Sequence, residues 1–157
     1  MQPKDYAAGW LPQKIFLGSL VVALILKLIV PLRFLGAGTG RETGAMFGWL
    51  IVAAAIGIAF WADLALKAAN APVSPDKPAR ALATGGPYRF SRNPIYLSLA
   101  LVLFGLGFVA DSFWPFLALI ISVLAVQKLA IEPEEADLAE NFGEAYRDYA
   151  NAVRRWL

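Results

Sequence analysis

Polar side chains that could do chemistry concentrate in one short stretch, residues 85–96, between long apolar blocks. It reads GGPYRFSRNPIY, and its two glycines and first proline predict a tight turn. Arg89 and Arg92 follow, three residues apart and flanked by aromatic residues. Asn93-Pro94 ends this segment and can start a helix, because proline is tolerated in the first helical turn. The pattern predicts a cationic, aromatic loop at the mouth of a membrane segment.

A second polar group, Glu134 and Glu135, opens the charged C-terminal segment of the chain. Two adjacent carboxylates can accept hydrogen bonds from hydroxyl or ammonium groups. Taken singly, this pair and the two arginines are typical of ordinary interfacial residues, because such charges flank most membrane helices. Their order along the chain, and no single residue, favours a shared site.

The sequence contains no histidine and no cysteine. Without histidine it lacks the usual general base, the Ser-His relay and the commonest metal ligand. Without cysteine it has neither disulfides nor thiolate chemistry. Any reaction must therefore rest on carboxylates, arginine, tyrosine or simple positioning, and we expect no bound metal.

The composition is typical of a membrane protein. Of the 157 residues, 59% are hydrophobic and 17% are charged, and the mean hydropathy is +0.57, well above that of a soluble domain. No linker is long enough to divide the chain, so residues 1–157 are predicted to form one domain. The net charge of +2 is weak evidence for nucleic acid, and we expect none, because the basic residues cluster beside apolar blocks. Residues 1–12 lack a signal-peptide cleavage pattern, so we expect the first apolar block to remain.

Four apolar blocks are candidates for membrane-spanning helices, which need roughly 20 apolar residues. They cover residues 15–35, 46–66, 95–109 and 113–131. The three-residue connection between the last two blocks predicts an antiparallel helical hairpin. The third block is short, so we expect its first turn to include Pro94 and to lie in a polar pocket. Lys27 interrupts the first block and is either a side chain that snorkels to the interface or a buried functional cation.

The segment after Pro133 is charged, yet its apolar residues recur at the spacing of a helix. These residues are Leu138, Phe142, Tyr146, Tyr149, Val153 and Trp156. We therefore predict an amphipathic helix over residues 134–156, bent at Gly143, that either lies on the membrane surface or docks on another part of the protein.

Lysine and arginine are distributed unequally between the loops, which predicts the orientation in the membrane. The loop of residues 62–94 and the C-terminal tail hold most of them, whereas the turn around Asp111 holds none. The basic residues of the loop and tail are Lys67, Lys77, Arg80, Arg89, Arg92, Arg147, Arg154 and Arg155. Four spans with both termini in the cytoplasm satisfy this asymmetry. The predicted fold is all-α: an integral membrane protein with about four transmembrane helices and a cytoplasmic C-terminal amphipathic helix.

The motifs of the C-terminal half, taken in order and spacing, resemble those of a known enzyme family. They are Gly86-Pro87-Tyr88-Arg89, Arg92-Asn93-Pro94-x-Tyr96, Glu134-Glu135-x-x-Leu138, Phe142-Gly143-x-x-Tyr146-x-x-Tyr149 and Val153-x-Arg155-Trp156. From about residue 72 to the end, the chain is similar to the integral-membrane methyltransferases of the isoprenylcysteine carboxyl methyltransferase and phospholipid N-methyltransferase group. Residues 1–68 match only as two hydrophobic spans, so residues 69–157 are the expected cofactor-binding half.

The resemblance implies an enzyme of the bacterial inner membrane that binds S-adenosylmethionine at the cytoplasmic face. Its cofactor-binding residues would be Tyr88, Arg89, Arg92, Asn93, Pro94, Tyr96, Glu134, Glu135 and Tyr146. Arg92 suits the carboxylate of the cofactor, and Glu134 or Glu135 suits its ammonium group or ribose hydroxyls. The tyrosines can stack on adenine or face the sulfonium. No residue is expected to act as acid or base, and Arg92 and Glu134 would act by positioning.

Asn93 departs from the eukaryotic pattern of this family, in which a histidine takes that place. The amide of Asn93 can still hydrogen-bond a cofactor, but it cannot carry a proton. Methyl transfer tolerates this loss, because a carboxylate, thiolate or neutral amine acceptor needs little base assistance. The absence of histidine is thus compatible with methyl transfer.

The expected acceptor is a lipophilic molecule that enters sideways from the bilayer, either a prenylcysteine-like carboxylate or a lipid head-group amine. Two other classes of protein stay open. One is a membrane reductase of the sterol-reductase type that uses NADPH, although such enzymes are usually longer. The other is a non-catalytic membrane module or small transporter, for which Lys27 is the only hint of a polar group at mid-membrane.

Overall fold

The computed structural model describes residues 10–35, 38–71 and 81–157. Every regular element in these ranges is helical, which confirms the predicted all-α fold. Residues 72–80 contribute three prolines, Lys77 and Arg80 to the loop and orientation predictions, and they lie outside the described residues.

The first two helices are α1 (Leu11–Ile29) and α2 (Thr39–Ala68), both rich in leucine, isoleucine, valine and alanine. α1 ends before Pro31 because a residue that precedes a proline is driven out of the helical region, and Val30 is extended. The predicted block of residues 15–35 therefore ran past the end of the helix. Lys27 lies half-buried in the last turn of α1, close enough to the helix end to snorkel.

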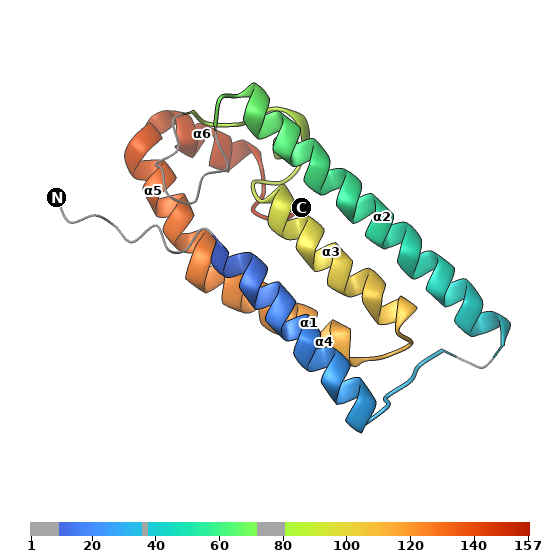
Figure 1. The fold of residues 1–157 in the computed structure, drawn as a ribbon. Coiled ribbons are helices and arrows are strands. Elements are labelled where there is room, and N and C mark those ends of the chain that lie inside the picture. The colour runs from blue at the N-terminus through green and yellow to red at the C-terminus, as the bar shows by residue number, and fades with distance from the viewer. Residues whose placement is uncertain (1–9, 36–37, 72–80) are drawn as a thin grey trace.

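The next two helices, α3 (Pro94–Val109) and α4 (Trp114–Val126), form the predicted antiparallel hairpin, and Pro94 stands in the first turn of α3 as expected. α3 packs between α2 and α4, and α4 packs on α1 (Figure 1). The contact between α2 and α3 is very close at two glycines. A Cβ atom on Gly48 would lie 2.5 Å from the carbonyl oxygen of Gly105, so neither position has room for a side chain.

Three helical stretches are long and apolar enough to cross a membrane, namely Leu11–Ile29, Thr39–Ala68 and Trp114–Phe142. α3 is apolar but has only 16 residues, which is about 24 Å against a hydrocarbon core of about 30 Å. Within the apolar layer, the hydroxyl groups of Ser19 on α1 and Ser122 on α4 hydrogen-bond at 2.6 Å. Each hydroxyl group thereby gains a hydrogen-bond partner that lipid could not supply.

The C-terminal helix differs from the prediction in where it begins. It does not start afresh after Pro133: α4 runs through a π-helical turn, η3 (Gln127–Ile131), directly into α5 (Glu132–Phe142). Proline lacks an N–H and its ring crowds the carbonyl group four residues back, and the wider π turn accommodates that crowding. The predicted bend is confirmed, because Gly143 has φ +56° and separates α5 from α6 (Glu144–Ala152).

The two ends of the bundle have different contents. At one end α5, α6, the C-terminus and the segment that leads into α3 lie together, beside the start of α1 and the end of α2 (Figure 1). At the other end lie the last turn of α1, the first turns of α2 and the connection between α3 and α4 (Figure 1). The two polar groups singled out in the sequence both belong to the first of these ends.

Candidate functional site

The polar loop is anchored to α2 through a glycine. Residues Gly86–Arg89 form a short 3-10 helix, η2, and Gly86 has φ +59°, a conformation that favours glycine. A Cβ atom at Gly86 would lie 3.2 Å from Nε1 of Trp61 and 3.0 Å from Cβ of Ala65, both on α2. The absence of a side chain at this position thus lets the loop lie directly on the end of α2.

On its other side the loop is held by α6. Tyr88 is buried, and its backbone carbonyl accepts a hydrogen bond of 2.7 Å from the hydroxyl of Tyr149. Arg89, the next residue, points outward and is exposed. The short 3-10 turn therefore places Tyr88 inside the site and Arg89 outside it.

The centre of the site is a carboxylate shared by two arginines. Glu135 on α5 accepts hydrogen bonds from Nε of Arg155 at 3.0 Å and from Nη2 of Arg155 at 2.6 Å. Nη2 of Arg92 lies 3.4 Å from Oε1 of the same carboxylate, and Nη1 of Arg92 lies 3.4 Å from the hydroxyl of Tyr146. The side chains of Arg92 and Glu135 are 15% and 16% exposed, so solvent screens their interaction only weakly.

One donor in this network has no partner. Nε of Arg92 is buried and has no hydrogen-bond partner among the described residues. A buried donor left unpaired costs about 1–3 kcal/mol, so the guanidinium of Arg92 is not fully satisfied by the described residues.

The neighbouring carboxylate, Glu134, is placed differently. Its Oε1 accepts a hydrogen bond of 2.6 Å from the hydroxyl of Tyr96 on α3, and no arginine within the described ranges pairs with it. Glu134 is thus held by a phenol, whereas Glu135 is neutralised by its two arginines. The two adjacent residues are chemically distinct.

The phenols of the site outside the spans stay protonated over the physiological range. Burial raises the pKa of Tyr88, and the charges at Tyr149, Glu134 and Asp63 raise it further. Burial raises the pKa of Tyr146, and the negative charge of Glu135 raises it further. These side chains are therefore available as hydrogen-bond donors, and none is a base. The hydrogen bond to Glu135 raises the pKa of Arg155, which fixes its positive charge.

The structure brings together most of the residues singled out in the sequence. Arg92, Glu135 and Tyr146 form one network, and Tyr96 and Glu134 form a second. The backbone of Tyr88 is joined to α6 through Tyr149.

Asn93 and Pro94 lie where the loop meets α3 and have different roles. Nδ2 of Asn93 donates a hydrogen bond of 3.1 Å to the backbone carbonyl of Arg155, and the buried Pro94 begins α3. Arg89 stays outside the network, as its exposure shows.

Two residues of the site were not among the candidates. Arg155 supplies the shorter contacts to Glu135, and Ser91 is buried with its hydroxyl 3.3 Å from the carbonyl oxygen of Arg155. Arg155 could have been found in the sequence, since it belongs to the Val-x-Arg-Trp motif. Ser91 carries no comparable signal.

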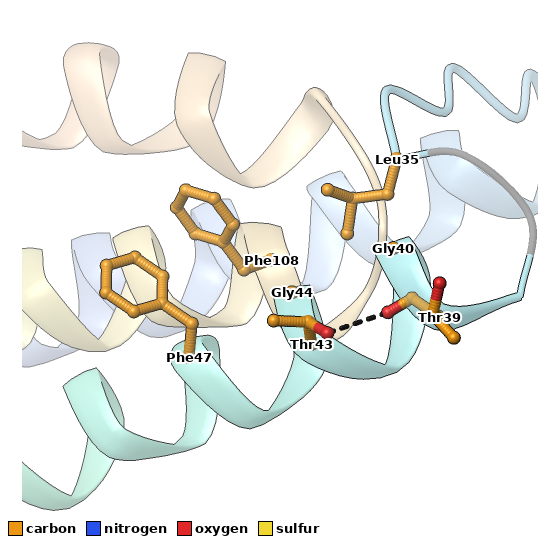
Figure 2. A pocket seen from close by; sticks show the side chains of 7 residues that line it. All are labelled: Leu35, Thr39, Gly40, Thr43, Gly44, Phe47 and Phe108. Carbon is orange, nitrogen blue, oxygen red and sulfur yellow. Dashed lines mark hydrogen bonds between the residues drawn. The ribbon is translucent and has the colours of Figure 1, made fainter.

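A hollow also exists at the opposite end of the bundle, but its walls carry little chemistry. It has a volume of about 520 Å³ and is open to the outside. It is lined by Leu35, Thr39, Gly40, Thr43, Gly44, Phe47 and Phe108 (Figure 2). The hydroxyl of Thr43 donates to the carbonyl of Thr39 at 2.8 Å. With no ionisable side chain in the lining, we place the candidate site at the charged end instead.

Comparison with known proteins gives one family and one relative. The family model for phospholipid methyltransferases matches residues 43–145, about two thirds of the chain. An uncharacterized protein of Haemophilus influenzae is 38% identical over 63 residues, which make up 40% of this chain and all of that protein. No solved structure matches. The family match begins within α2, includes both carboxylates and ends in the first turn of α6, before Tyr146 and Arg155.

Proposed function

Because the chain belongs to the phospholipid methyltransferase family and is an integral membrane protein, we propose that it transfers a methyl group from S-adenosylmethionine to a lipid at the cytoplasmic face. The family favours this function over a sterol-reductase-like enzyme or a transporter. The single observation that carries the proposal is the pair of charged networks at one end of the bundle, centred on Arg92 and on Glu134.

The two networks match the two charges of an amino-acid group. Arg92, with its unpaired Nε, suits the carboxylate of S-adenosylmethionine, because guanidinium and carboxylate form charge-assisted hydrogen bonds. Glu134 suits the ammonium group, since Tyr96 is its only partner in the network described above. Glu135 is already shared by two arginines and would serve to orient them. The residues present therefore fit the cofactor.

The remaining residues would shape the walls of the site. Tyr88 and Tyr96 offer ring faces to the adenine or to the sulfonium cation, which aromatic rings attract. Asn93 would act through the backbone of Arg155 that it holds, and Pro94 would set the start of α3. We leave Arg89 out of the cofactor site because it is exposed.

The reaction needs positioning more than acid-base chemistry. When bound, S-adenosylmethionine supplies an electrophilic methyl group on a sulfonium; the lone pair of the acceptor forms the new bond and the C–S bond breaks to give a neutral sulfide. This chain would hold donor and acceptor in line, which can account for much of the rate. The protonated phenols of Tyr88 and Tyr146 are unsuited to act as bases, so an acceptor amine would lose its proton to solvent.

Among the acceptors, a lipid head-group amine is favoured over a prenylcysteine-like carboxylate by the match to phospholipid methyltransferases. The amine would react in its neutral form, because the ammonium form has no lone pair. The acceptor would reach the site from the bilayer, past α1 and α2, so that residues 1–68 serve the acceptor and residues 69–157 the cofactor.

The test of the function uses protein purified in detergent. We expect S-adenosylmethionine to bind by calorimetry and NADPH not to bind; the reverse result would favour the reductase. With labelled donor, we expect transfer into phosphatidylethanolamine and none into a farnesylcysteine analogue. Label found only in small water-soluble acceptors would contradict a lipid substrate.

Orientation is tested separately by labelling single cysteines in intact cells. Cysteine placed at the exposed Thr84 is expected to react only from the cytoplasm, and cysteine placed at the exposed Arg41 only from the outside. The opposite pattern would place the site on the outer face, which would contradict the cytoplasmic assignment.

A further inference from the structure

The last residues of the chain, 153–157, lie across the polar loop and are called the strap below. Three consecutive loop residues hold its backbone. The hydroxyl of Ser91 and Nδ2 of Asn93 donate to the carbonyl of Arg155 at 3.3 and 3.1 Å, and the backbone N–H of Arg92 donates to the carbonyl of Arg154 at 3.0 Å. The strap is thus hydrogen-bonded to the same loop that carries Arg92.

The side chains of the strap reach two further elements. Arg155 forms its bidentate pair with Glu135 on α5. Nε1 of Trp156 lies 3.3 Å from Oε1 of Gln127 in η3, and its ring packs on the buried cluster that includes Val126 and Ile131. The strap therefore links the loop, the π turn and α5, which are separate along the chain.

The distances from Glu135 to its two arginines show which of them it binds more closely. Arg155 approaches Glu135 to 2.6 and 3.0 Å, whereas Arg92 approaches it only to 3.4 Å. Bidentate pairing is the preferred geometry between a guanidinium and a carboxylate, and here Arg155 takes it. Arg92 consequently keeps Nε unpaired and is only partly neutralised.

We propose that Arg155 is a positioning residue for the cofactor: it holds Glu135 in a bidentate pair, so that Glu135 neutralises Arg92 only in part and Arg92 keeps charge for the carboxylate of the ligand. This inference rests on the proposed function. Its reason is electrostatic. Arg92, Arg155 and Glu135 together carry a charge of +1, whereas Arg92 and Glu135 alone carry none and would pair with each other.

Two ligands that differ in the amino-acid group test this role of Arg155. S-adenosylhomocysteine, the product of methyl transfer, has the carboxylate, and methylthioadenosine lacks it. In Arg155→Ala we expect the affinity for S-adenosylhomocysteine to fall by about 10-fold or more, as for loss of a charged hydrogen bond. The affinity for methylthioadenosine should stay as in the wild type.

A second substitution distinguishes positioning from a purely structural role. Adding Glu135→Gln to Arg155→Ala restores the charge of +1 and removes the anion that would capture Arg92. The double variant is therefore expected to bind S-adenosylhomocysteine more tightly than Arg155→Ala alone. If Arg155 only stabilised the fold, the second substitution would weaken binding further or leave it unchanged.

Calorimetry on detergent-purified proteins, with thermal unfolding as the check on folding, measures all of these affinities. Arg154→Ala is the matched control, because its side chain is exposed and its role lies in its backbone carbonyl; it should bind as the wild type. Arg155→Lys keeps the charge but not the paired donors of the guanidinium, and its affinity should lie between those of Arg155→Ala and the wild type. If Arg155→Ala does not fold, Arg155→Lys takes its place in the comparison.

The outcomes separate this inference from the function on which it rests. A wild-type protein that binds neither S-adenosylmethionine nor S-adenosylhomocysteine would overturn the proposed function. A wild type that binds, together with an Arg155→Ala variant of equal affinity or one weakened equally for methylthioadenosine, would overturn the role of Arg155 alone.

Discussion

The two ends of the bundle use the same kinds of residue to opposite effect. At the end away from the site, Asp111 is 3% exposed and accepts hydrogen bonds from the backbone N–H groups of Phe34 at 3.1 Å and Leu35 at 2.8 Å. Burial alone would raise the pKa of Asp111, but these two bonds, with Arg41 and Arg33 nearby, lower it. One oxygen of its carboxylate, Oδ1, thus accepts two backbone hydrogen bonds within the protein.

Around Asp111 the packing is aromatic. The ring of Phe34 contacts those of Phe108, Phe113 and Phe116 at centroid distances of 5.6, 5.1 and 5.5 Å. At the site end, by contrast, Arg92 keeps an unpaired buried donor and Glu134 has a single phenol as partner. A polar group that is satisfied internally stabilises the fold, and one that is left unsatisfied is available to a ligand. The comparison predicts which substitutions change binding and which change stability.

The largest effect is expected at the site end, from Arg92→Ala. It removes the proposed partner of the cofactor carboxylate, and the affinity for S-adenosylmethionine should fall by about 10- to 100-fold. Arg92→Lys keeps the charge without the planar guanidinium, and its affinity should lie between those of Arg92→Ala and the wild type. Calorimetry measures the affinity and thermal unfolding the stability. If Arg92→Ala binds the cofactor as the wild type while folded, the cofactor lies elsewhere.

At the other end, Asp111→Ala should lower stability and leave cofactor affinity unchanged. Two buried N–H groups lose their acceptor, which costs about 1–3 kcal/mol in the free energy of unfolding. Asp111 also has φ +46°, so Asp111→Asn is the matched control: it keeps an acceptor oxygen and tolerates that conformation. Unfolding in detergent measures the loss. A marked drop in cofactor affinity with unchanged stability would reverse the assignment of the two ends.

A smaller effect is expected where α6 holds the loop. Tyr149→Phe removes the hydrogen bond to the carbonyl of Tyr88, and this should cost about 1 kcal/mol of stability at neutral pH.

The same substitution has a pH signature. Burial raises the pKa of Tyr149 from 10.0 to about 12, with Tyr146 adding to the shift and Arg92 opposing it. Below pH 10.0 both folded and unfolded states hold the proton, so the contribution of Tyr149 is complete there. Between pH 10.0 and about 12 only the unfolded state ionises, so stability is lost as the pH rises. Tyr149→Phe should lose less stability across this window than the wild type does, and equal losses would contradict a buried phenol.

The apolar spans and the bend at Gly143 could be predicted because their signals are local. Helical periodicity marks a buried stripe, and glycine suits the positive φ at the bend. The break expected at Pro133 is absent because a π turn, which has no clear sequence signature, carries the helix past the proline. The predicted bounds of the first two helices also differ from those observed. α1 ends before Pro31, and α2 begins at Thr39, several residues before the apolar block that starts at residue 46.

The candidate site was predictable as a set of residue types but not as a set of contacts. The pairing of Arg155 with Glu135 depends on the chain turning back after α6, over a separation of 20 residues. The difference between Glu134 and Glu135 depends on which side of α5 faces α3 and which faces the strap. Arg89 and Arg92 look alike in the sequence, and only the 3-10 turn separates an exposed side chain from a half-buried one.

The π turn at Gln127–Ile131 also sets the phase of everything that follows it. Such a turn contains one residue more than an α-helical turn, and each residue advances a helix by about 100°. Glu134 and Glu135 therefore face α3 and the strap because of an insertion made before them in the same helix. If this turn became α-helical with all its residues kept, the helix after it would rotate by about one residue's advance, roughly 100°, and both carboxylates would leave the site. Such a change would remove both glutamates from the site while leaving each of them in the sequence.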